Sequence, residues 1–275
     1  MNNGDQNLLD LAIASAKKAA EVILNVYQSG DFQTETKQDH SPLTIADRES
    51  HNIISSILAP AGLPLLSEEG KSIDFNTRTG WGRFWLVDPL DGTKEFLKRN
   101  GDFTVNIALI ENGCPVLGVV CIPVTGEVYY AAKGSGSFKI DAASMVVKLP
   151  IRSGIAVEDH GLRVVASRSH LDVRTERFIA TLKEPVTVSR GSSLKFLLLA
   201  EGRADVYPRF APTMEWDTAA AQIILEEAGI SVINVDDGMP LQYNKPDLLN
   251  PFFLAVPGQP QRLGDWMGKC ITLKD

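Results

Sequence analysis

Residues 84–96 constrain the fold more than any other stretch, with the sequence Phe-Trp-Leu-Val-Asp-Pro-Leu-Asp-Gly-Thr-Lys-Glu-Phe. Four large apolar residues in a row predict a strand that is buried on both faces. Because Pro89 has no backbone N–H, we expect the strand to end at Asp88. Gly92 and Thr93 then mark the start of a new element. A close backbone approach and free N–H groups there would suit an anion.

Acidic residues gather around this turn. Asp88 and Asp91 lie three residues apart, and Glu68 and Glu69 follow the apolar run at 63–66. Two like charges about 4 Å apart repel by roughly 4 kcal/mol at an effective dielectric near 20. A divalent cation would offset this repulsion if the acids converge, and oxygen-only ligands favour Mg²⁺ over Zn²⁺. The alternative is a purely structural turn, since Asp-Pro-x-Asp-Gly is also common turn chemistry.

The first half of the chain predicts an α+β arrangement. Apolar residues at helical spacing indicate a helix over 5–29, and Thr44 with Asp47 fits a capping box for a helix that ends near Leu58. An antiparallel meander separated by turns should follow, with strands at 103–110, 115–122, 127–132 and 137–140.

Strands and helices alternate in the second half, which predicts an α/β arrangement. The expected strands are 163–167, 186–188, 204–207, 231–235 and 251–256, and the expected helices are 172–182, 193–200 and 215–228. We therefore place a domain boundary near residue 150. It would separate a metal-binding domain, 1–150, from a substrate-specificity domain, 151–275.

Composition excludes several classes of protein. The formal net charge of −7 argues against a general nucleic-acid binder. Three cysteines without a Cys-x-x-Cys motif indicate reduced thiols and a cytoplasmic protein. We expect neither a signal peptide nor a transmembrane segment. Attachment to the cytoplasmic face of the inner membrane, and the choice between monomer and homodimer, stay open.

Three motifs resemble those of the inositol monophosphatase superfamily in order and spacing, over nearly the whole chain. They are Glu68-Glu69, Asp88-Pro-Leu-Asp91-Gly-Thr93 and Trp216-Asp217-Thr-Ala-Ala. Members of this superfamily are lithium-sensitive, Mg²⁺-dependent phosphomonoesterases with a layered αβαβα fold. Within it, Lys94-Glu95-Phe96 and Ser167-Arg-Ser-His170 resemble the CysQ-type 3′(2′),5′-bisphosphate nucleotidases.

The resemblance implies a centre for two or three Mg²⁺ ions. Its ligands would be Glu68, Asp88, the Leu90 carbonyl, Asp91 and Asp217. Without the resemblance, Asp217 would be a first-turn acid that complements the helix dipole.

The resemblance also implies catalytic roles. Thr93 and Asp47 would take a proton from the attacking water, while the N–H groups of Gly92 and Thr93 grip the phosphate. No phosphoenzyme would form.

Substrate contacts would extend into the second half of the chain. Besides Glu68, Leu90, Asp91, Gly92, Thr93 and Asp217, the expected substrate-binding residues are Ser169, His170, Ser192, Lys195 and Arg209. Ser192 could cradle a second phosphate at the start of a helix, with Lys195 one turn on. The alternatives are a serine N-cap and a solvated lysine.

The resemblance therefore implies hydrolysis of the 3′-phosphate of adenosine 3′,5′-bisphosphate to AMP and phosphate in sulfate assimilation. 3′-Phosphoadenylyl sulfate is a further expected substrate. One alternative is inositol monophosphatase or fructose-1,6-bisphosphatase activity on the same scaffold. Another is a regulatory protein that binds RNA or protein and in which catalysis is incidental.

Overall fold

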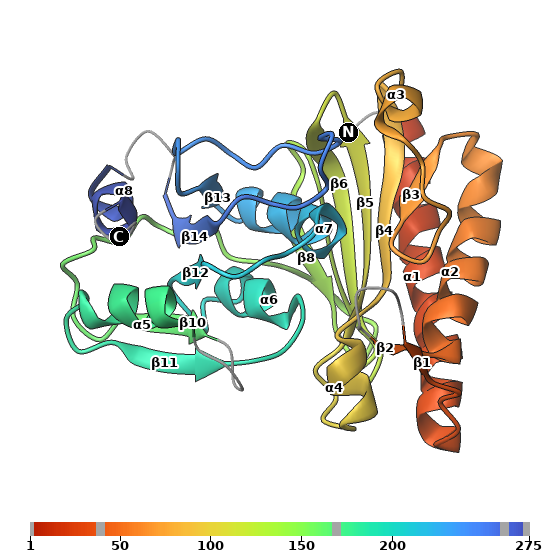
Figure 1. Cartoon of the computed structure of the whole chain (residues 1–275), viewed down its shortest axis with the longest axis horizontal. Coiled ribbons are helices and arrows are strands. Elements are labelled where there is room, and N and C mark those ends of the chain that lie inside the picture. Colours follow the sequence, from red (N-terminus) through yellow and green to blue (C-terminus); the bar gives the residue numbers. More distant parts are fainter. Residues whose placement is uncertain (1–2, 37–41, 167–171, 259–263, 272–275) are drawn as a thin grey trace.

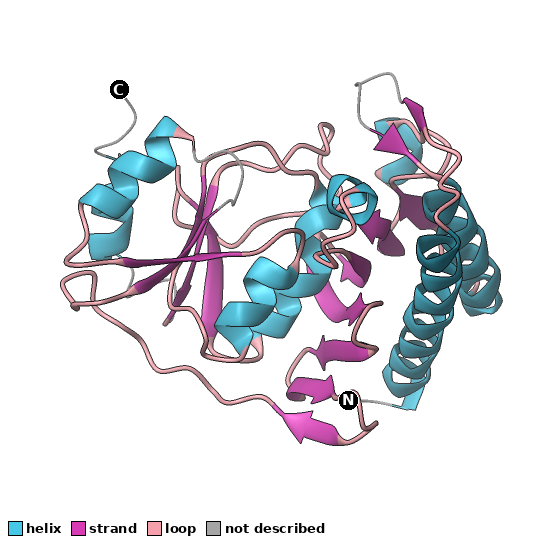
Figure 2. Ribbon diagram, turned by 90° about the horizontal axis from the view of Figure 1, so that it is seen from below, coloured by secondary structure: helices cyan, strands magenta, loops and turns pink. Residues whose placement is uncertain are grey.

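The two amphipathic helices predicted at the start of the chain pack side by side on one face of a seven-stranded sheet (Figures 1 and 2). This computed structural model describes residues 3–36, 42–166, 172–258 and 264–271. Two further helices cover the other face of the sheet. Smaller sheets and a last pair of helices complete five layers, which Figure 2 shows edge-on. The expected αβαβα fold is confirmed.

The bounds of the elements in the first half are α1 Asn3–Ser29, β1 Glu35–Thr36, β2 Pro42–Leu43, α2 Ile45–Leu58, η1 Ala59–Ala61, β3 Leu65–Ser67, α3 Phe75–Arg78, β4 Arg83–Asp91, α4 Thr93–Leu97, β5 Thr104–Glu111, β6 Cys114–Ile122, β7 Glu127–Ala132, β8 Gly136–Ile140 and β9 Val146–Lys148. Those in the second half are β10 Arg163–Ala166, α5 Val173–Ala180, β11 Val186–Ser189, α6 Leu194–Ala200, β12 Tyr207–Arg209, α7 Glu215–Glu226, β13 Ile230–Asn234, β14 Phe253–Pro257 and α8 Gly264–Ile271.

The large sheet runs in the order β3-β4-β5-β6-β7-β8-β9. β3 pairs with β4 in parallel, and every other neighbouring pair in this sheet is antiparallel. β4 is thus an inner strand, and residues 84–90 are buried, as the apolar run predicted.

Helix α7 lies against the sheet face opposite α1 and approaches it closely (Figures 1 and 2). A Cβ added to Gly118 of β6 would lie 2.3 Å from the carbonyl oxygen of Ala220 in α7. Glycine on the strand and the small residues Ala219–Ala221 on the helix permit this contact. The start of α7 lies close to the end of β4, since the Ser193 hydroxyl is within 3.0 Å of Asp91 Oδ2 and 3.1 Å of the Asp217 carbonyl.

One expected boundary, the end of the strand at Asp88, is wrong. β4 continues to Asp91, which pairs with Thr104 of β5, although the register shifts between Asp88 and Asp91. Pro89 donates no ladder bond, and the irregularity around it accommodates that loss. Both acids therefore belong to the end of a buried strand.

The second half also differs from its expected strand pattern. β12 spans Tyr207–Arg209 instead of 204–207, because Val206 pairs with Val164 of β10 while Tyr207 pairs with Ala255 of β14. β10 and β11 are parallel, whereas the β12-β14-β13 sheet is antiparallel. The short elements β1, β2, α3, β9 and α8 were not predicted.

One apolar cluster contains buried residues from both halves of the chain, including Leu86 in β4 and Ile223 in α7. The domain boundary near residue 150 stays a prediction. Among the described residues, no helix is both long enough and apolar enough to cross a bilayer.

Candidate active site

Parallel pairing of β3 with β4 brings the acidic motifs together. Because parallel strands end at the same edge, Glu68 follows β3 beside the end of β4. The Glu68 N–H donates to the Val87 carbonyl at 3.1 Å, which places Glu68 next to Asp88. Asp91 follows at the end of β4, and Asp217 enters from the first turn of α7.

These acids change one another's pKa. Burial raises the pKa of Asp88 well above its usual value, and the charges of Glu68, Asp91 and Asp217 raise it further. Burial followed by the charge of Asp91 raises the pKa of Asp217 to about 8, despite a hydrogen bond from the Met214 N–H. Acids in such surroundings become fully ionised only beside a cation.

The donor types fit Mg²⁺, which prefers carboxylate and carbonyl oxygens. One oxygen of Asp88 accepts from the Leu90 N–H at 3.1 Å, and one of Asp217 accepts from the Met214 N–H at 2.8 Å. Their second oxygens, and that of Asp91, accept no hydrogen bond from any described residue. In the described ranges, no three Asp, Glu, His or Cys side chains already form a complete metal site. Side-chain rotation would have to complete the coordination.

Asp47 serves two partners with its two oxygens. Oδ2 accepts from the Thr44 N–H at 2.8 Å and from the Thr44 hydroxyl at 2.5 Å, which confirms the predicted capping box. Oδ1 accepts from the Thr93 hydroxyl at 3.0 Å. Asp47 is buried, so helix α2 holds it rigidly behind Thr93.

Gly92 connects β4 to the short helix α4 and has a φ of 94°, which favours glycine. A Cβ at this position would lie 3.0 Å from the Asp102 carbonyl and 3.3 Å from the Ser192 Cβ. The Thr93 N–H lies in the first turn of α4, where N–H groups have no partner within the helix.

Segment 190–195 lies against this turn, but its serines contact Asp91. The Asp91 Oδ2 atom accepts from the Ser192 hydroxyl at 2.6 Å, from the Ser193 N–H at 2.7 Å and from the Ser193 hydroxyl at 3.0 Å. Ser192, predicted as a substrate contact, also lies 2.7 Å from the Thr104 hydroxyl. It therefore orients Asp91 in this structure.

Of the other predicted substrate contacts, two line the cavity beside Asp91 and two lie outside the described residues. Lys195 donates to the Ser192 carbonyl at 3.3 Å, and Arg209 donates to the Pro212 carbonyl at 3.1 Å. Both line the same cavity as Asp91. Ser169 and His170 lie outside the described residues.

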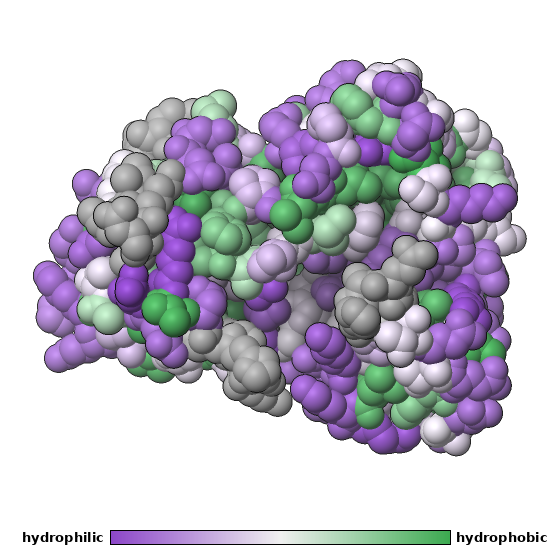
Figure 3. All heavy atoms as spheres, viewed as in Figure 1, coloured by the Kyte–Doolittle hydropathy of each residue, from purple (hydrophilic) through white to green (hydrophobic). Residues whose placement is uncertain are grey.

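This cavity has a volume of about 460 Å³ and lies between α4 and segment 190–195. Figure 3 shows a hollow between the two lobes of the molecule, with hydrophilic side chains along its lower edge and hydrophobic ones above it. The five basic residues in the cavity lining are Lys94, Lys98, Arg190, Lys195 and Arg209, and the three acidic ones are Asp91, Glu95 and Asp102. The lining is thus net positive in a chain of net charge −7.

Sequence reasoning missed Lys98 and Arg190 and used Lys94 only as part of a motif. A signal was present, because Lys94 in α4 and Lys98 directly after it are four residues apart, which is the spacing of one helical turn. Arg190 directly precedes the Gly191-Ser192 turn. None of the three side chains makes a hydrogen bond or ion pair with a described residue.

Comparison with known proteins matches residues 5–261 to the model of the inositol monophosphatase family. The 3′(2′),5′-bisphosphate nucleotidase CysQ of Escherichia coli strain K12 is 44% identical over 252 residues, which cover 90% of this chain and 98% of that protein. The protein of the same name from Haemophilus influenzae is 34% identical over 262 residues, 93% of this chain and 94% of that one.

Solved structures of similar proteins also include a member of this family. CysQ from Bacteroides thetaiotaomicron, described as a bacterial member of the inositol monophosphatase family, is 46% identical. Its TM-score is 0.81, and the match covers 92% of this chain and 98% of that one. An IMPase from Thermotoga maritima is 24% identical with a TM-score of 0.73, over 97% of each chain, and shows the fold alone.

Proposed function

The chain belongs to the inositol monophosphatase family, and we propose that within it the protein is a Mg²⁺-dependent 3′(2′),5′-bisphosphate nucleotidase. It would hydrolyse the 3′-phosphate of adenosine 3′,5′-bisphosphate to give AMP and inorganic phosphate. 3′-Phosphoadenylyl sulfate is a second proposed substrate, and lithium is a proposed inhibitor.

One observation carries this proposal beyond the family. A single cavity contains Asp91 and Gly92 at the end of β4 together with a surplus of basic side chains. A substrate with one phosphate needs only the first group of residues. A substrate with two phosphates can use both, and the volume of about 460 Å³ lies in the usual range for small-molecule sites.

Glu68, Asp88, the Leu90 carbonyl, Asp91 and Asp217 would hold two or three Mg²⁺ ions. When bound, these ions would polarise the phosphoryl group and stabilise its developing charge. The serines around Asp91 would keep that carboxylate oriented, and the Met214 N–H would do the same for Asp217.

The arrangement of Thr93 and Asp47 supports a role in proton transfer. The Thr93 hydroxyl donates to Asp47 Oδ1 at 3.0 Å and has a longer contact of 3.4 Å with the Leu90 carbonyl, so the Thr93 oxygen can accept a hydrogen bond from a water molecule. Thr93 would pass its hydroxyl proton to Asp47 as it takes one from that water, and the Thr44 hydrogen bonds would limit the movement of Asp47. Water is the nucleophile in this scheme, and no side chain forms a covalent intermediate.

The test is phosphate release with Mg²⁺ from adenosine 3′,5′-bisphosphate, inositol 1-phosphate and fructose 1,6-bisphosphate at equal concentrations, with and without lithium. We expect the nucleotide to be strongly preferred and lithium to inhibit. A preference for inositol phosphate or the sugar would retain the metal site and reject the nucleotide assignment. No release from any substrate by folded, Mg²⁺-loaded protein would favour a regulatory binding protein.

A further inference from the structure

A buried cation, Arg78, lies outside the site just described. It ends helix α3 in the connection from β3 to β4, and only 2% of its surface is exposed. Its guanidinium donates to the side-chain oxygen of Asn244 at 2.8 Å and to the carbonyls of Lys245 at 3.1 Å and Pro246 at 3.4 Å. Asn244 returns a hydrogen bond to the Arg78 carbonyl at 2.9 Å.

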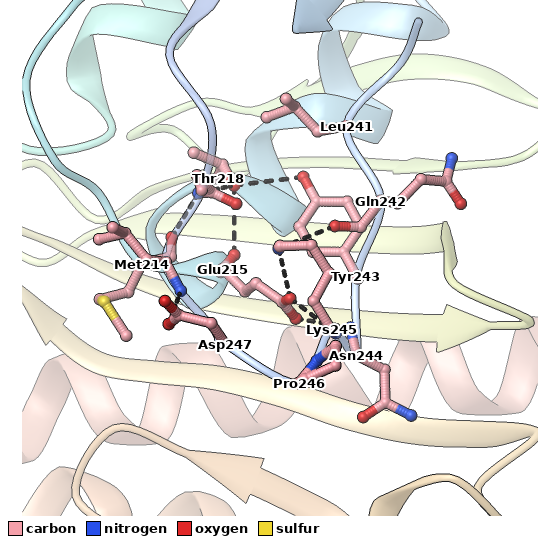
Figure 4. A network of polar contacts seen from close by, with 12 residues as sticks. Met214, Glu215, Thr218, Leu241, Gln242, Tyr243, Asn244, Lys245, Pro246 and Asp247 are labelled. Atoms are coloured by element: carbon pink, nitrogen blue, oxygen red, sulfur yellow. Dashed lines mark hydrogen bonds and ion pairs between the residues drawn. The ribbon is translucent and has the colours of Figure 1, made fainter. Parts of the chain in front are cut away.

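A buried anion, Glu215, meets the same loop from the other side. It is the first residue of α7 and is fully buried. Its carboxylate accepts from the backbone N–H of Asn244 at 2.6 Å and of Lys245 at 3.0 Å, and it also contacts the Lys245 ammonium. Figure 4 shows Glu215 facing Asn244 and Lys245.

The stretch 244–246 therefore lies between two buried charges of opposite sign. Its carbonyl oxygens accept from Arg78, and its N–H groups donate to Glu215. Each charge stabilises the backbone dipoles that face it, and isolated buried charges would be costly. Because Pro246 has no N–H, its carbonyl is its only backbone hydrogen-bonding group.

The same loop holds the first turn of α7 at further points. The side chain of Asn250 donates to the Met214 carbonyl at 2.7 Å and to the Thr218 hydroxyl at 3.0 Å. The Glu215 N–H donates to the Leu248 carbonyl at 2.9 Å. Residues 241–250, between β13 and β14, contain all of these loop contacts and are called loop 241–250 below. Asp217 belongs to the first turn of α7, so its position depends on this loop.

We propose that Arg78 and Glu215 are positioning residues that act through loop 241–250. They would fix the turn that carries Asp217 relative to the β3–β4 unit that carries Glu68 and Asp88. Correct spacing of these carboxylates would favour binding of Mg²⁺. The proposal rests on the proposed function, since it concerns the affinity of that metal centre.

Three variants test this role. Arg78→Met removes the cation and keeps an apolar chain, whereas Glu215→Gln keeps the shape and removes the charge. Asn244→Gly removes only the side-chain link to Arg78, and glycine tolerates the φ of 65° at this position. We expect each to weaken Mg²⁺ binding by about tenfold or more, the usual effect of losing a residue that supports a metal ligand.

The matched control is Arg163→Met. Arg163 pairs with Asp205, at a Nη2 to Oδ1 distance of 2.6 Å, and its side chain makes no hydrogen bond or ion pair with the described site residues. It should lower the Tm while leaving the Kd for Mg²⁺ within about twofold of the wild-type value. Mg²⁺ binding is measured by calorimetry, and the rise in Tm on adding Mg²⁺ gives a second readout without substrate.

The outcomes separate this proposal from the proposed function. Folded Arg78→Met or Glu215→Gln protein that binds Mg²⁺ as tightly as wild type would overturn the positioning role. If Arg78→Met does not fold, Asn244→Gly decides by the same criterion. A wild-type protein that binds Mg²⁺ and hydrolyses the nucleotide, with unchanged affinity in the variants, would refute only the positioning role. Wild-type protein that binds no Mg²⁺ would refute both.

Discussion

The buried carboxylates of this chain differ in what surrounds them. Burial raises the pKa of Asp205, but the hydrogen bonds from Arg163 and the charges of Arg163 and Arg152 together outweigh it, so the pKa is lowered. Asp88 and Asp217 face other acids, and their pKa values are raised. A carboxylate paired with a cation supports the fold on its own, whereas a group of mutually repelling acids indicates a binding site for a cation.

The largest expected effect is the loss of activity on replacing an acid of the proposed metal site, compared with an acid that pairs with arginine. Asp91→Asn should lower the rate of phosphate release by at least about 1,000-fold, because a metal centre contributes several kcal/mol of transition-state stabilisation. Circular dichroism should show an unchanged fold. Asp205→Asn should do the reverse, with lower Tm and nearly wild-type activity. A fully active Asp91→Asn protein would refute the metal assignment.

The two oxygens of Asp47 allow the same comparison within one residue. Thr93→Val removes the partner of Oδ1 and should lower kcat by about 100-fold or more, the usual contribution of proton transfer. Thr44→Ala removes the side-chain partner of Oδ2 and should cost about 1 kcal/mol of stability with little loss of activity. Steady-state kinetics and thermal unfolding of both variants provide the check. If Thr93→Val and Thr44→Ala lowered kcat equally, the two oxygens of Asp47 would not have separate roles, and its position alone would matter.

Side-chain cations that pair with no carboxylate in the described part of the chain give the third contrast. Replacing both Lys94 and Lys98 by alanine should reduce the preference for adenosine 3′,5′-bisphosphate over adenosine 3′-monophosphate by about tenfold or more, since a charge-assisted contact contributes roughly 1.5–3 kcal/mol. Lys148→Ala, on the outer strand β9, is the control. An unchanged preference in the double variant would place the second phosphate elsewhere.

A smaller effect concerns stability and pH in protein without Mg²⁺. The pKa of Asp217 is about 8 in the folded chain and 3.8 ordinarily, so between these values the folded state binds more protons than the unfolded state. Stability should therefore fall as pH rises through this window, and Asp88 adds to the effect. Added Mg²⁺ should restore the Tm at the upper end.

The contribution of Asp205 to folding stability changes with pH in the opposite direction. Its pKa is lowered, so its contribution is present above the ordinary value of 3.8 and is lost as pH falls through the folded value. Thermal unfolding across pH, with Asp205→Asn as the comparison, measures both trends. A metal-free Tm that stays constant from pH 4 to about 8 would contradict the raised pKa values.

Local patterns predicted much of this architecture. The period of apolar residues located α1, α2 and α7, and the turn residues located β5 to β8. The Thr44–Asp47 capping box depends on residues three apart, so it was visible in the sequence. The ends of β4 and β12 were not, because each depends on a partner strand far away in the chain.

The candidate site shows the same division. Glu68, Asp88, Asp91 and Thr93 stand in short motifs, whereas their nearness to Asp217 came from resemblance and not from local pattern. The cationic cavity combines α4 with segment 190–195, and the Arg78–Glu215 arrangement joins residues that only tertiary packing brings together. Side-chain contacts of this kind have no periodic signature in a sequence.

The most direct test of the account is a calorimetric titration of Mg²⁺ into the wild-type protein at neutral pH, in buffers with different ionisation enthalpies. We expect binding with release of protons, because Asp217 is largely protonated below its pKa of about 8 until a cation is present. Asp91→Asn should bind much more weakly. No binding, or binding without proton release that Asp91→Asn leaves unchanged, would contradict a magnesium centre built from these carboxylates.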